Sequence, residues 1–288
     1  MSRTDTGLAA VGNVWAAVVT FRKLLLSAVV VLVGGVLLFP LYILLSAALK
    51  TRQEYFADAL ALPTSPQFGN FTEAWTDGGF QTYMLNSAII VGIGLIVLLA
   101  VSLLAAYALV QFDIGGTKYL LLVVIAGLMV PPQVLIAPLF PIMDSVGWIN
   151  TRLSLIAVYV AFAIPFSVFF FRQYFVTLPA SYAAAARLDG CSELQVFTRI
   201  YLPLSIPAIT TVFVFQFVLF WNEFLYALLF ITEDSRRTTP AGLNAFQGEF
   251  GQDFTLLAAS VIIAAIPAII VFLIFRKYFV QGFIQGQT

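Results

Sequence analysis

The chain has 288 residues, of which 61% are hydrophobic and only 10% charged, whereas soluble domains carry roughly 25% charged residues. It has no histidine, the commonest metal ligand and general base, and its lone Cys191 cannot form an intrachain disulfide. Net charge is zero and no Walker A pattern occurs, so we expect no enzyme, no metal site, no nucleic-acid partner and no ATP site of its own.

Six apolar windows are long enough to cross a bilayer, which takes about 20 residues per helix. They lie at 24–49, 84–111, 119–141, 152–175, 205–231 and 255–275. We therefore predict an all-α polytopic membrane protein with a segment 1–23, a six-helix transmembrane domain 24–278 and a tail 279–288. The first window exceeds the apolar region of a cleaved signal peptide, so we expect it to be retained.

The sign of the loop charge alternates along the chain, which predicts the orientation. With the N-terminus inside, the cytoplasmic segments hold nine basic and four acidic residues, and the outer segments hold five and nine. The reversed topology would invert this bias, so we predict that both termini are cytoplasmic. The longer connections are then the outer loops 51–83 and 232–254 and the cytoplasmic loop 176–204.

The cytoplasmic loop 176–204 predicts a helix that ends in a glycine turn. Pro179 fits the first turn of a helix, and residues 180–188 are nearly all helix formers. Gly190 then fits the left-handed position that ends a helix.

A second helix is predicted after this turn. Ser192 and Gln195 have the spacing of a capping box. Leu194, Phe197 and Tyr201 recur at helical period, which predicts that they share one face. The two helices form either a rigid hook for a partner or an amphipathic element that rests on the membrane surface.

The fifth window contains an ionisable side chain, Glu223. Exposing a charge to lipid costs at least about 2.5 kcal/mol, so such a group faces the bundle interior or water. Trp221, Asn222 and Glu223 form a polar cluster that either lines a pathway or bonds a neighbouring helix. Kinks are expected where prolines fall within the windows, at Pro40, Pro131, Pro132, Pro138, Pro165, Pro207 and Pro267.

The segment from Leu178 to Pro203 resembles the EAA motif of binding-protein-dependent ABC permeases. In that family the pattern is Glu-Ala-Ala, three residues, Gly, and a downstream Leu-Pro. The matching positions are Ala185, Ala186, Asp189, Gly190, Leu202 and Pro203. Position 184 departs from the pattern, because alanine replaces the glutamate, which puts one polar contact in doubt.

Short matches along the rest of the chain are similar to the sugar-transporting branch, which includes the smaller permease subunit of the maltose importer. They are Asn86-Ser87, Met129-Val130-Pro131, Trp221-Asn222-Glu223-Phe224, and the glycines at 282 and 286. The resemblance implies a type I ABC importer permease fold and makes 24–278 a permease domain in a bacterial or archaeal cytoplasmic membrane.

The resemblance also implies partners. They are a second permease, two ATPase subunits that use ATP and Mg²⁺, an external binding protein and the surrounding lipid. Loop 176–204 would dock into an ATPase cleft. The implied coupling residues are Tyr182, Ala185, Ala186, Asp189, Gly190, Leu194 and Phe197.

Loop 232–254 is polar and contains glycines, which suits contact with a soluble partner, although a solvated connector is the alternative. In related permeases this loop extends toward the docked binding protein. We therefore expect Asn244, Phe246 and Gln247 to form its tip.

Two other functions stay open at this point. A stand-alone secondary transporter or channel would need Glu223 for ion coupling. An ABC permease for glycerol phosphate or another non-sugar solute would share every motif above.

Overall fold

The computed structural model describes residues 5–112, 115–248 and 253–285, with side chains over 22–112, 115–244 and 253–276, and contains only helices and connecting loops there. The long helices are α1 (Asp5–Ala48), α4 (Phe80–Gln111), α7 (Arg152–Thr177) and α14 (Phe254–Gln285). Shorter elements before α7 are α2 (Arg52–Ala57), α3 (Gly69–Thr76), α5 (Thr117–Leu128), the 3₁₀ turn η1 (Pro132–Leu135) and α6 (Ile136–Ser145). Those after α7 are α8 (Ala180–Leu188), α9 (Glu193–Val196), the π-helical turn η2 (Phe197–Tyr201), α10 (Leu202–Leu204), α11 (Ile206–Trp221), α12 (Leu225–Phe230), the 3₁₀ turn η3 (Asp234–Arg236) and α13 (Thr239–Gly248).

Four helices are long and apolar enough to cross a membrane. They are α4, α7, the Arg22–Ala48 part of α1 and the Phe254–Arg276 part of α14. Two bent pairs are further candidates, namely α5 with η1–α6 at 90° and α9–α10 with α11 at 72°. The described residues therefore hold six spans if each bent pair counts as one, in agreement with an all-helical polytopic membrane protein.

The kink expected at Pro131 and Pro132 is present, and the third and fifth windows, 119–141 and 205–231, are both interrupted. α5 ends at Leu128, and Pro131 is extended (φ −64°, ψ 124°) before η1 begins, because two consecutive prolines remove two backbone donors. In the fifth window α11 ends at Trp221 and a separate helix, α12, begins at Leu225.

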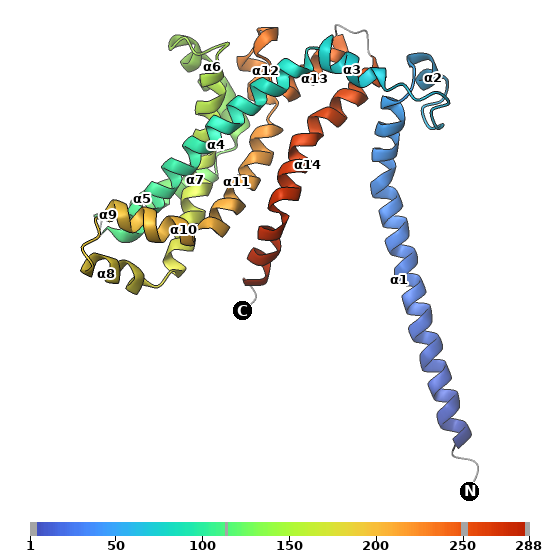
Figure 1. Cartoon of the computed structure of the whole chain (residues 1–288), viewed down its shortest axis with the longest axis horizontal. Coiled ribbons are helices and arrows are strands. Elements are labelled where there is room, and N and C mark those ends of the chain that lie inside the picture. Colours follow the sequence, from blue (N-terminus) through green and yellow to red (C-terminus); the bar gives the residue numbers. More distant parts are fainter. Residues whose placement is uncertain (1–4, 113–114, 249–252, 286–288) are drawn as a thin grey trace.

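α4, α7 and α11 form the centre of the bundle (Figure 1). One apolar cluster joins them and includes Leu98 of α4, Leu155 of α7 and Phe220 of α11. Because lipid is as apolar as these side chains, close packing holds the helices together rather than removal from water. Gly94 of α4 illustrates this closeness, since a Cβ there would lie 3.3 Å from the Phe220 ring of α11.

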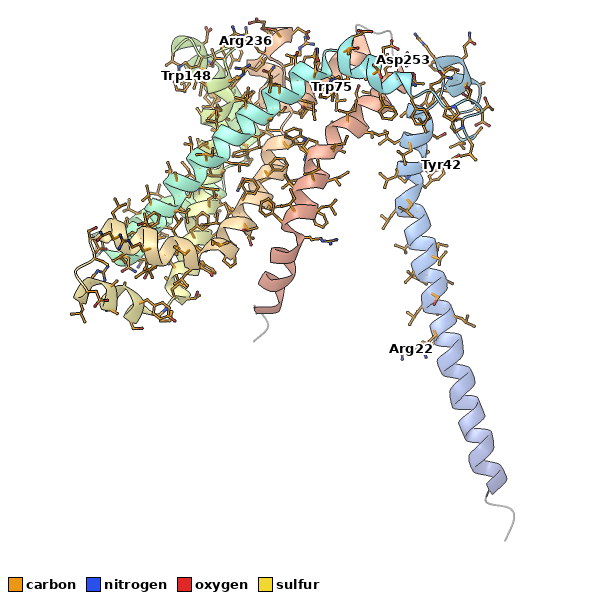
Figure 2. All side chains as sticks on the ribbon, viewed as in Figure 1. Arg22, Tyr42, Trp75, Trp148, Arg236 and Asp253 are labelled. Atoms are coloured by element: carbon orange, nitrogen blue, oxygen red, sulfur yellow. The ribbon has the colours of Figure 1, made fainter. Side chains whose placement is uncertain are left out.

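α1 stands apart from this bundle over most of its length (Figure 1). Between Arg22 and Tyr42 its side chains lie apart from the other helices (Figure 2), and no part of its most apolar window is buried. Only its end joins the bundle, where Ala47 and Ala48 pack in a cluster with Phe80 of α4 and residues of α14.

The two ends of the bundle carry different elements (Figure 1). The beginning of α1, the end of α14 and the α8–α9 pair lie toward one end, and α2, α3 and α13 lie at the other. Assigning the α8–α9 end to the cytoplasm stays a prediction from the loop charges.

Candidate functional site

Residues 176–204, here called the hook, fold as the predicted pair of helices joined by a glycine turn. Gly190 has φ +81°, and no described atom lies within 4 Å of a Cβ built there, so the backbone conformation rather than space requires glycine. The predicted capping box is present, because Ser192 Oγ accepts the Gln195 N–H at 3.4 Å and Gln195 Oε1 accepts the Ser192 N–H at 2.8 Å. Pro179 lies at the N-cap of α8 rather than in its first turn, since its ψ of 123° is not helical.

The implied coupling residues divide between the surface of the hook and its interior. The exposed members are Tyr182, Ala185, Asp189, Gly190 and Leu194, and the buried members are Ala186 and Phe197.

The three residues predicted to share one face, Leu194, Phe197 and Tyr201, differ in burial. Leu194 is 67% exposed, while Phe197 and Tyr201 are 8% and 2% exposed. Both rings pack against Tyr107 of α4, with ring centroids 5.2 and 5.1 Å away. They therefore attach the hook to the bundle, whereas Leu194 is left on the surface.

A ring of polar side chains also ties the hook to α4. The ion pair Arg187–Glu193 bridges α8 and α9, with Nε–Oε1 at 2.7 Å and Nη2–Oε2 at 3.1 Å. The Tyr107 hydroxyl donates to Glu193 Oε2 at 2.8 Å. The Gln111 amide accepts from Arg187 Nη2 at 2.9 Å and donates to the Tyr201 hydroxyl. Hydrogen bonding to the Glu193 carboxylate raises the pKa of the Arg187 guanidinium.

Sequence analysis missed this ring. Its one sequence signal is the pair of opposite charges on either side of the glycine turn. That spacing matches no helical period, so no pattern in the neighbouring sequence predicted a contact with α4.

Glu223 lies in the break between α11 and α12, where its carboxylate replaces missing helical bonds. Its Oε1 accepts the Tyr226 N–H at 2.8 Å and its Oε2 accepts the Ala227 N–H at 3.1 Å, so the carboxylate caps α12. The Tyr159 hydroxyl of α7 donates to Oε2 at 2.8 Å, and the Tyr226 hydroxyl donates to the Pro132 carbonyl of η1 at 2.5 Å. Glu223 therefore bonds a neighbouring helix, and its role in lining a pathway stays a prediction.

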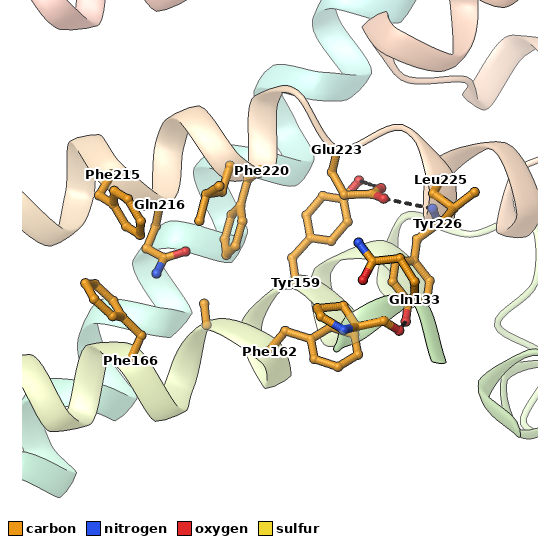
Figure 3. A pocket seen from close by; sticks show the side chains of 13 residues that line it. Gln133, Tyr159, Phe162, Phe166, Phe215, Gln216, Phe220, Glu223, Leu225 and Tyr226 are labelled. Carbon is orange, nitrogen blue, oxygen red and sulfur yellow. Dashed lines mark hydrogen bonds between the residues drawn. The ribbon is translucent and has the colours of Figure 1, made fainter. Parts of the chain in front are cut away.

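Glu223 also faces a pocket of about 370 Å³ between α7, η1 and the α11–α12 break (Figure 3). Aromatic rings make up much of its wall, contributed by Tyr159, Phe162, Phe166, Phe215, Phe220 and Tyr226. The polar groups are the carboxylate and the side-chain amides of Gln133 and Gln216. Gln216 is only 2% exposed, and its amide has no hydrogen-bond partner among the described groups.

The other two members of the predicted polar cluster point elsewhere. Trp221 is buried and donates its indole N–H to the Ala264 carbonyl of α14 at 3.0 Å. Asn222 is exposed and donates to the Val218 carbonyl of its own helix at 2.8 Å. The structure therefore separates Glu223 from its two sequence neighbours and brings it together with α7 and η1 residues that the sequence did not single out.

At the opposite end, Asn86 anchors residues 232–248, here called the far loop. Its buried amide donates to the Ser235 and Arg237 carbonyls, both at 3.0 Å, and its Oδ1 accepts from Arg152 Nη2 at 2.8 Å. One side chain therefore satisfies two backbone carbonyls and joins α4, α7 and the loop.

Neighbouring side chains of α4 add further contacts to the far loop. Ser87 Oγ accepts the Thr239 N–H at 2.8 Å, and the Tyr83 hydroxyl bonds Asp234 Oδ1 at 2.9 Å. Gly242 lies directly against the Tyr83 ring, where a Cβ would come within 2.2 Å, so this position of α13 requires glycine. The far loop is thus tightly fitted to the start of α4.

The proposed tip of the far loop lies on a helix rather than in an irregular loop. Residues 239–248 form α13, and Asn244 is exposed there. The side chains of Phe246 and Gln247 lie outside the described residues. As for metals, no three described Asp, Glu or Cys side chains gather closely enough to hold an ion.

Comparison with known sequences places these features in a family. The sequence profile described as "Binding-protein-dependent transport system inner membrane component" matches residues 101–285. The chain is 38% identical over 210 residues to the trehalose/maltose transport system permease protein MalG of Thermococcus litoralis, which covers 72% of this chain and 75% of that protein. It is 31% identical over 261 residues to the diacetylchitobiose uptake system permease protein NgcG of Streptomyces coelicolor, covering 90% and 86%.

Solved structures share the fold. A bacterial ABC transporter involved in import of the acidic polysaccharide alginate has a chain that superposes with a TM-score of 0.77 at 21% identity, covering 90% of this chain and 97% of that one. The same type of transporter in complex with an alginate pentasaccharide-bound periplasmic protein superposes at 0.67 and 15% identity, covering 91% and 95%. At these identities the likeness concerns the fold alone.

Proposed function

This chain belongs to the binding-protein-dependent inner-membrane transport components of ABC transporters, and from that premise we propose that it lines part of the pathway by which an importer moves a carbohydrate. The observation that carries the proposal is the pocket at the α11–α12 break. Its partners would be a second permease, two ATPase subunits that hold ATP and Mg²⁺, and an external binding protein. The setting would be a bacterial or archaeal cytoplasmic membrane with both termini inside.

The lining of the pocket supports a neutral sugar as cargo. Ligand sites in proteins are mostly apolar concavities of about 300–1,000 Å³ with a few placed polar groups, and this pocket has that form at 370 Å³. Aromatic rings suit the C–H faces of a sugar ring, while Gln133 and Gln216 can donate to and accept from hydroxyl groups. The Gln216 amide lines the pocket and forms no hydrogen bond with another described residue, so it is available to bond a sugar hydroxyl.

Charge argues against an anionic cargo such as glycerol phosphate. Glu223 is the one charged residue among the described side chains that line the pocket, and its negative charge would repel a phosphate. A secondary transporter would use Glu223 for ion coupling, but this carboxylate already accepts three hydrogen bonds, two that cap α12 and one from Tyr159.

The exposed surface of the hook supports docking to an ATPase. Leu188 is 89% exposed, Leu194 67% and Tyr182 49%, an unusual concentration of apolar side chains on a short charged element. With Ala184 in place of the family glutamate, these groups would provide most of the contact. The far loop, with Asn244, Phe246 and Gln247 on α13, would contact the binding protein at the other end.

Reconstituted proteoliposomes test the proposal. The chain is combined with a second permease, an ATPase and a binding protein from its own organism, and uptake of labelled disaccharides, trisaccharides, a polyol and glycerol phosphate is measured. We expect ATP-dependent uptake of an oligosaccharide. Uptake of glycerol phosphate alone, or uptake that continues without ATP at constant membrane potential, would overturn the proposal.

A pair of variants tests the pocket itself. Gln216→Leu keeps the volume but removes the amide, and we expect the uptake rate to fall about tenfold, the equivalent of about 1.4 kcal/mol. Gln173→Leu, on an exposed part of α7, is the matched control and should transport normally. Equal uptake by both variants would show that sugar does not pass Gln216.

A further inference from the structure

α4 makes hydrogen bonds with both the hook and the far loop. At one end Tyr107 and Gln111 bond the Arg187–Glu193 pair of the hook. At the other end Asn86 and Ser87 bond backbone groups of the far loop. Two regions at opposite ends of the molecule are therefore attached to the same helix (Figure 1).

α4 also differs from the other candidate spans in being continuous and free of proline. It runs for 32 residues, whereas α1, α7 and α14 contain Pro40, Pro165 and Pro267, and the two remaining candidates are bent by 90° and 72°. A proline removes a backbone hydrogen bond and lets a helix kink. At 1.5 Å per residue, Ser87 and Tyr107 lie about 30 Å apart along one uninterrupted rod.

We propose that α4 is the element that couples docking at the hook to docking at the far loop, through Tyr107 at one end and Ser87 and Asn86 at the other. The inference rests on the proposed function, because it takes the hook as the ATPase contact and the far loop as the binding-protein contact. A shift of the hook pulls on α4 through side chains that are bonded to it, and α4 moves the backbone of the far loop. Coupling of this kind is reciprocal, so binding protein at the far loop alters the ATPase through the same helix.

Tyr107→Phe is the first test. It keeps the ring that packs on Phe197 and Tyr201 but removes the hydroxyl that bonds Glu193. We expect stimulation of ATP hydrolysis by the binding protein, loaded with the sugar found in the uptake panel, to fall about tenfold. Co-purification of the ATPase should persist, because the exposed face of the hook is unaltered.

The matched control is Tyr174→Phe. Its hydroxyl donates to the Leu204 carbonyl at 2.9 Å at the same end of the molecule rather than bonding a described group of α4, and stimulation should stay at the wild-type level. Full stimulation in Tyr107→Phe would refute the inference, as would an equal loss in both variants.

A double variant tests whether the two ends act through one path. Ser87→Ala removes the acceptor of the Thr239 N–H, and Ser145→Ala on α6 is its control. We expect each single variant to lose about tenfold in stimulation of ATP hydrolysis. If α4 is the shared link, the double variant should still lose about tenfold, whereas two independent effects would multiply to about a hundredfold. A multiplied loss would overturn the inference. A wild-type complex that imports no sugar would instead refute the proposed function.

Discussion

The hook and the far loop are both attached to α4, yet the attachments differ in kind. At the hook the polar bonds run between side chains, and the central ion pair is half in water, with Arg187 and Glu193 39% and 40% exposed. At the far loop, neutral groups bond the backbone inside the protein, where Asn86 and Ser87 are 1% and 2% exposed. Beside its buried aromatic packing, the hook therefore uses polar contacts that water can replace, whereas the polar contacts of the far loop are buried.

This difference predicts where mutations are costly. An ion pair in contact with water contributes about 0–1 kcal/mol, because water and salt replace it. Removing a buried partner leaves the groups it bonded without water or protein contacts, at about 1–3 kcal/mol each. The far-loop end should be rigid and intolerant, while the hook end can adjust to a partner at small cost.

The largest effect is expected for Asn86→Leu. This change leaves the Ser235 and Arg237 carbonyls and the Arg152 guanidinium without their buried partner, so we expect a loss of about 3 kcal/mol in the free energy of unfolding. Unfolding of the detergent-solubilised protein in denaturant measures it. Asn222→Leu, at an exposed side chain, should cost less than about 0.5 kcal/mol. Similar losses in the two variants would contradict the comparison.

A smaller effect is expected for Gly190→Val in the hook. The left-handed conformation at φ +81° costs a residue with a Cβ about 1–2 kcal/mol, so α9 should change direction and ATPase docking should weaken. Co-purification of the ATPase with the permease measures docking. Gly69→Val at the start of α3, where a Cβ has open space, is the control. Undiminished recovery of the ATPase with Gly190→Val would contradict the prediction that this turn fixes the direction of α9.

The ion pair itself should matter less for stability. Glu193→Gln removes the charge that pairs with Arg187, and we expect less than about 1 kcal/mol of destabilisation at low salt. The difference from wild type should shrink in about 1 M NaCl, where charges are screened beyond about 3 Å. Thermal unfolding at both salt concentrations measures this. A loss as large as that of Asn86→Leu, or one insensitive to salt, would show that the two ends do not differ as described.

The smallest effect concerns Glu54 of α2. The Thr64 backbone N–H, at 2.6 Å from Oε1, holds the pKa of this carboxyl below its ordinary value. A lowered folded-state pKa means that the contribution to stability is present above the unfolded pKa of about 4.3 and is lost as the pH falls through the folded pKa. Comparing wild type with Glu54→Gln from about pH 6 to pH 3 should show the two curves converging in acid. If the two curves of stability against pH run parallel, the Thr64–Glu54 hydrogen bond makes no pH-dependent contribution to stability.

Much of the hook was predictable because its signals are local. Gly190 ends a helix for reasons that involve a few neighbouring residues, and the Ser192–Gln195 capping box depends only on their spacing. Where the prediction required knowing what lies beside the helix, it failed. Leu194 and Phe197 are both apolar, and only the position of Tyr107 on α4 decides which of them is buried.

The candidate pathway was predictable in only one residue. Glu223 stood out because charge is rare in an apolar window, but its neighbours Trp221 and Asn222 point away from the pocket. Tyr159, Phe162 and Gln216 look like ordinary members of a spanning helix in the sequence. They become a site because α7 and η1 lie opposite the break in the fifth span.

By itself the sequence determined that this chain is an all-helical membrane protein with a hook whose two helices are joined by a glycine turn. Hydropathy, charge bias and helix capping can each be recognised from a short stretch of sequence. The tertiary structure decided that the fifth window breaks after Trp221, that a carboxylate caps the helix after this break, and that α4 holds both ends of the molecule. Those features depend on contacts between residues as far apart as Asn86 and Arg237. Hydrophobic periodicity along one helix cannot predict such pairs, because the two residues meet only after several helices have packed together.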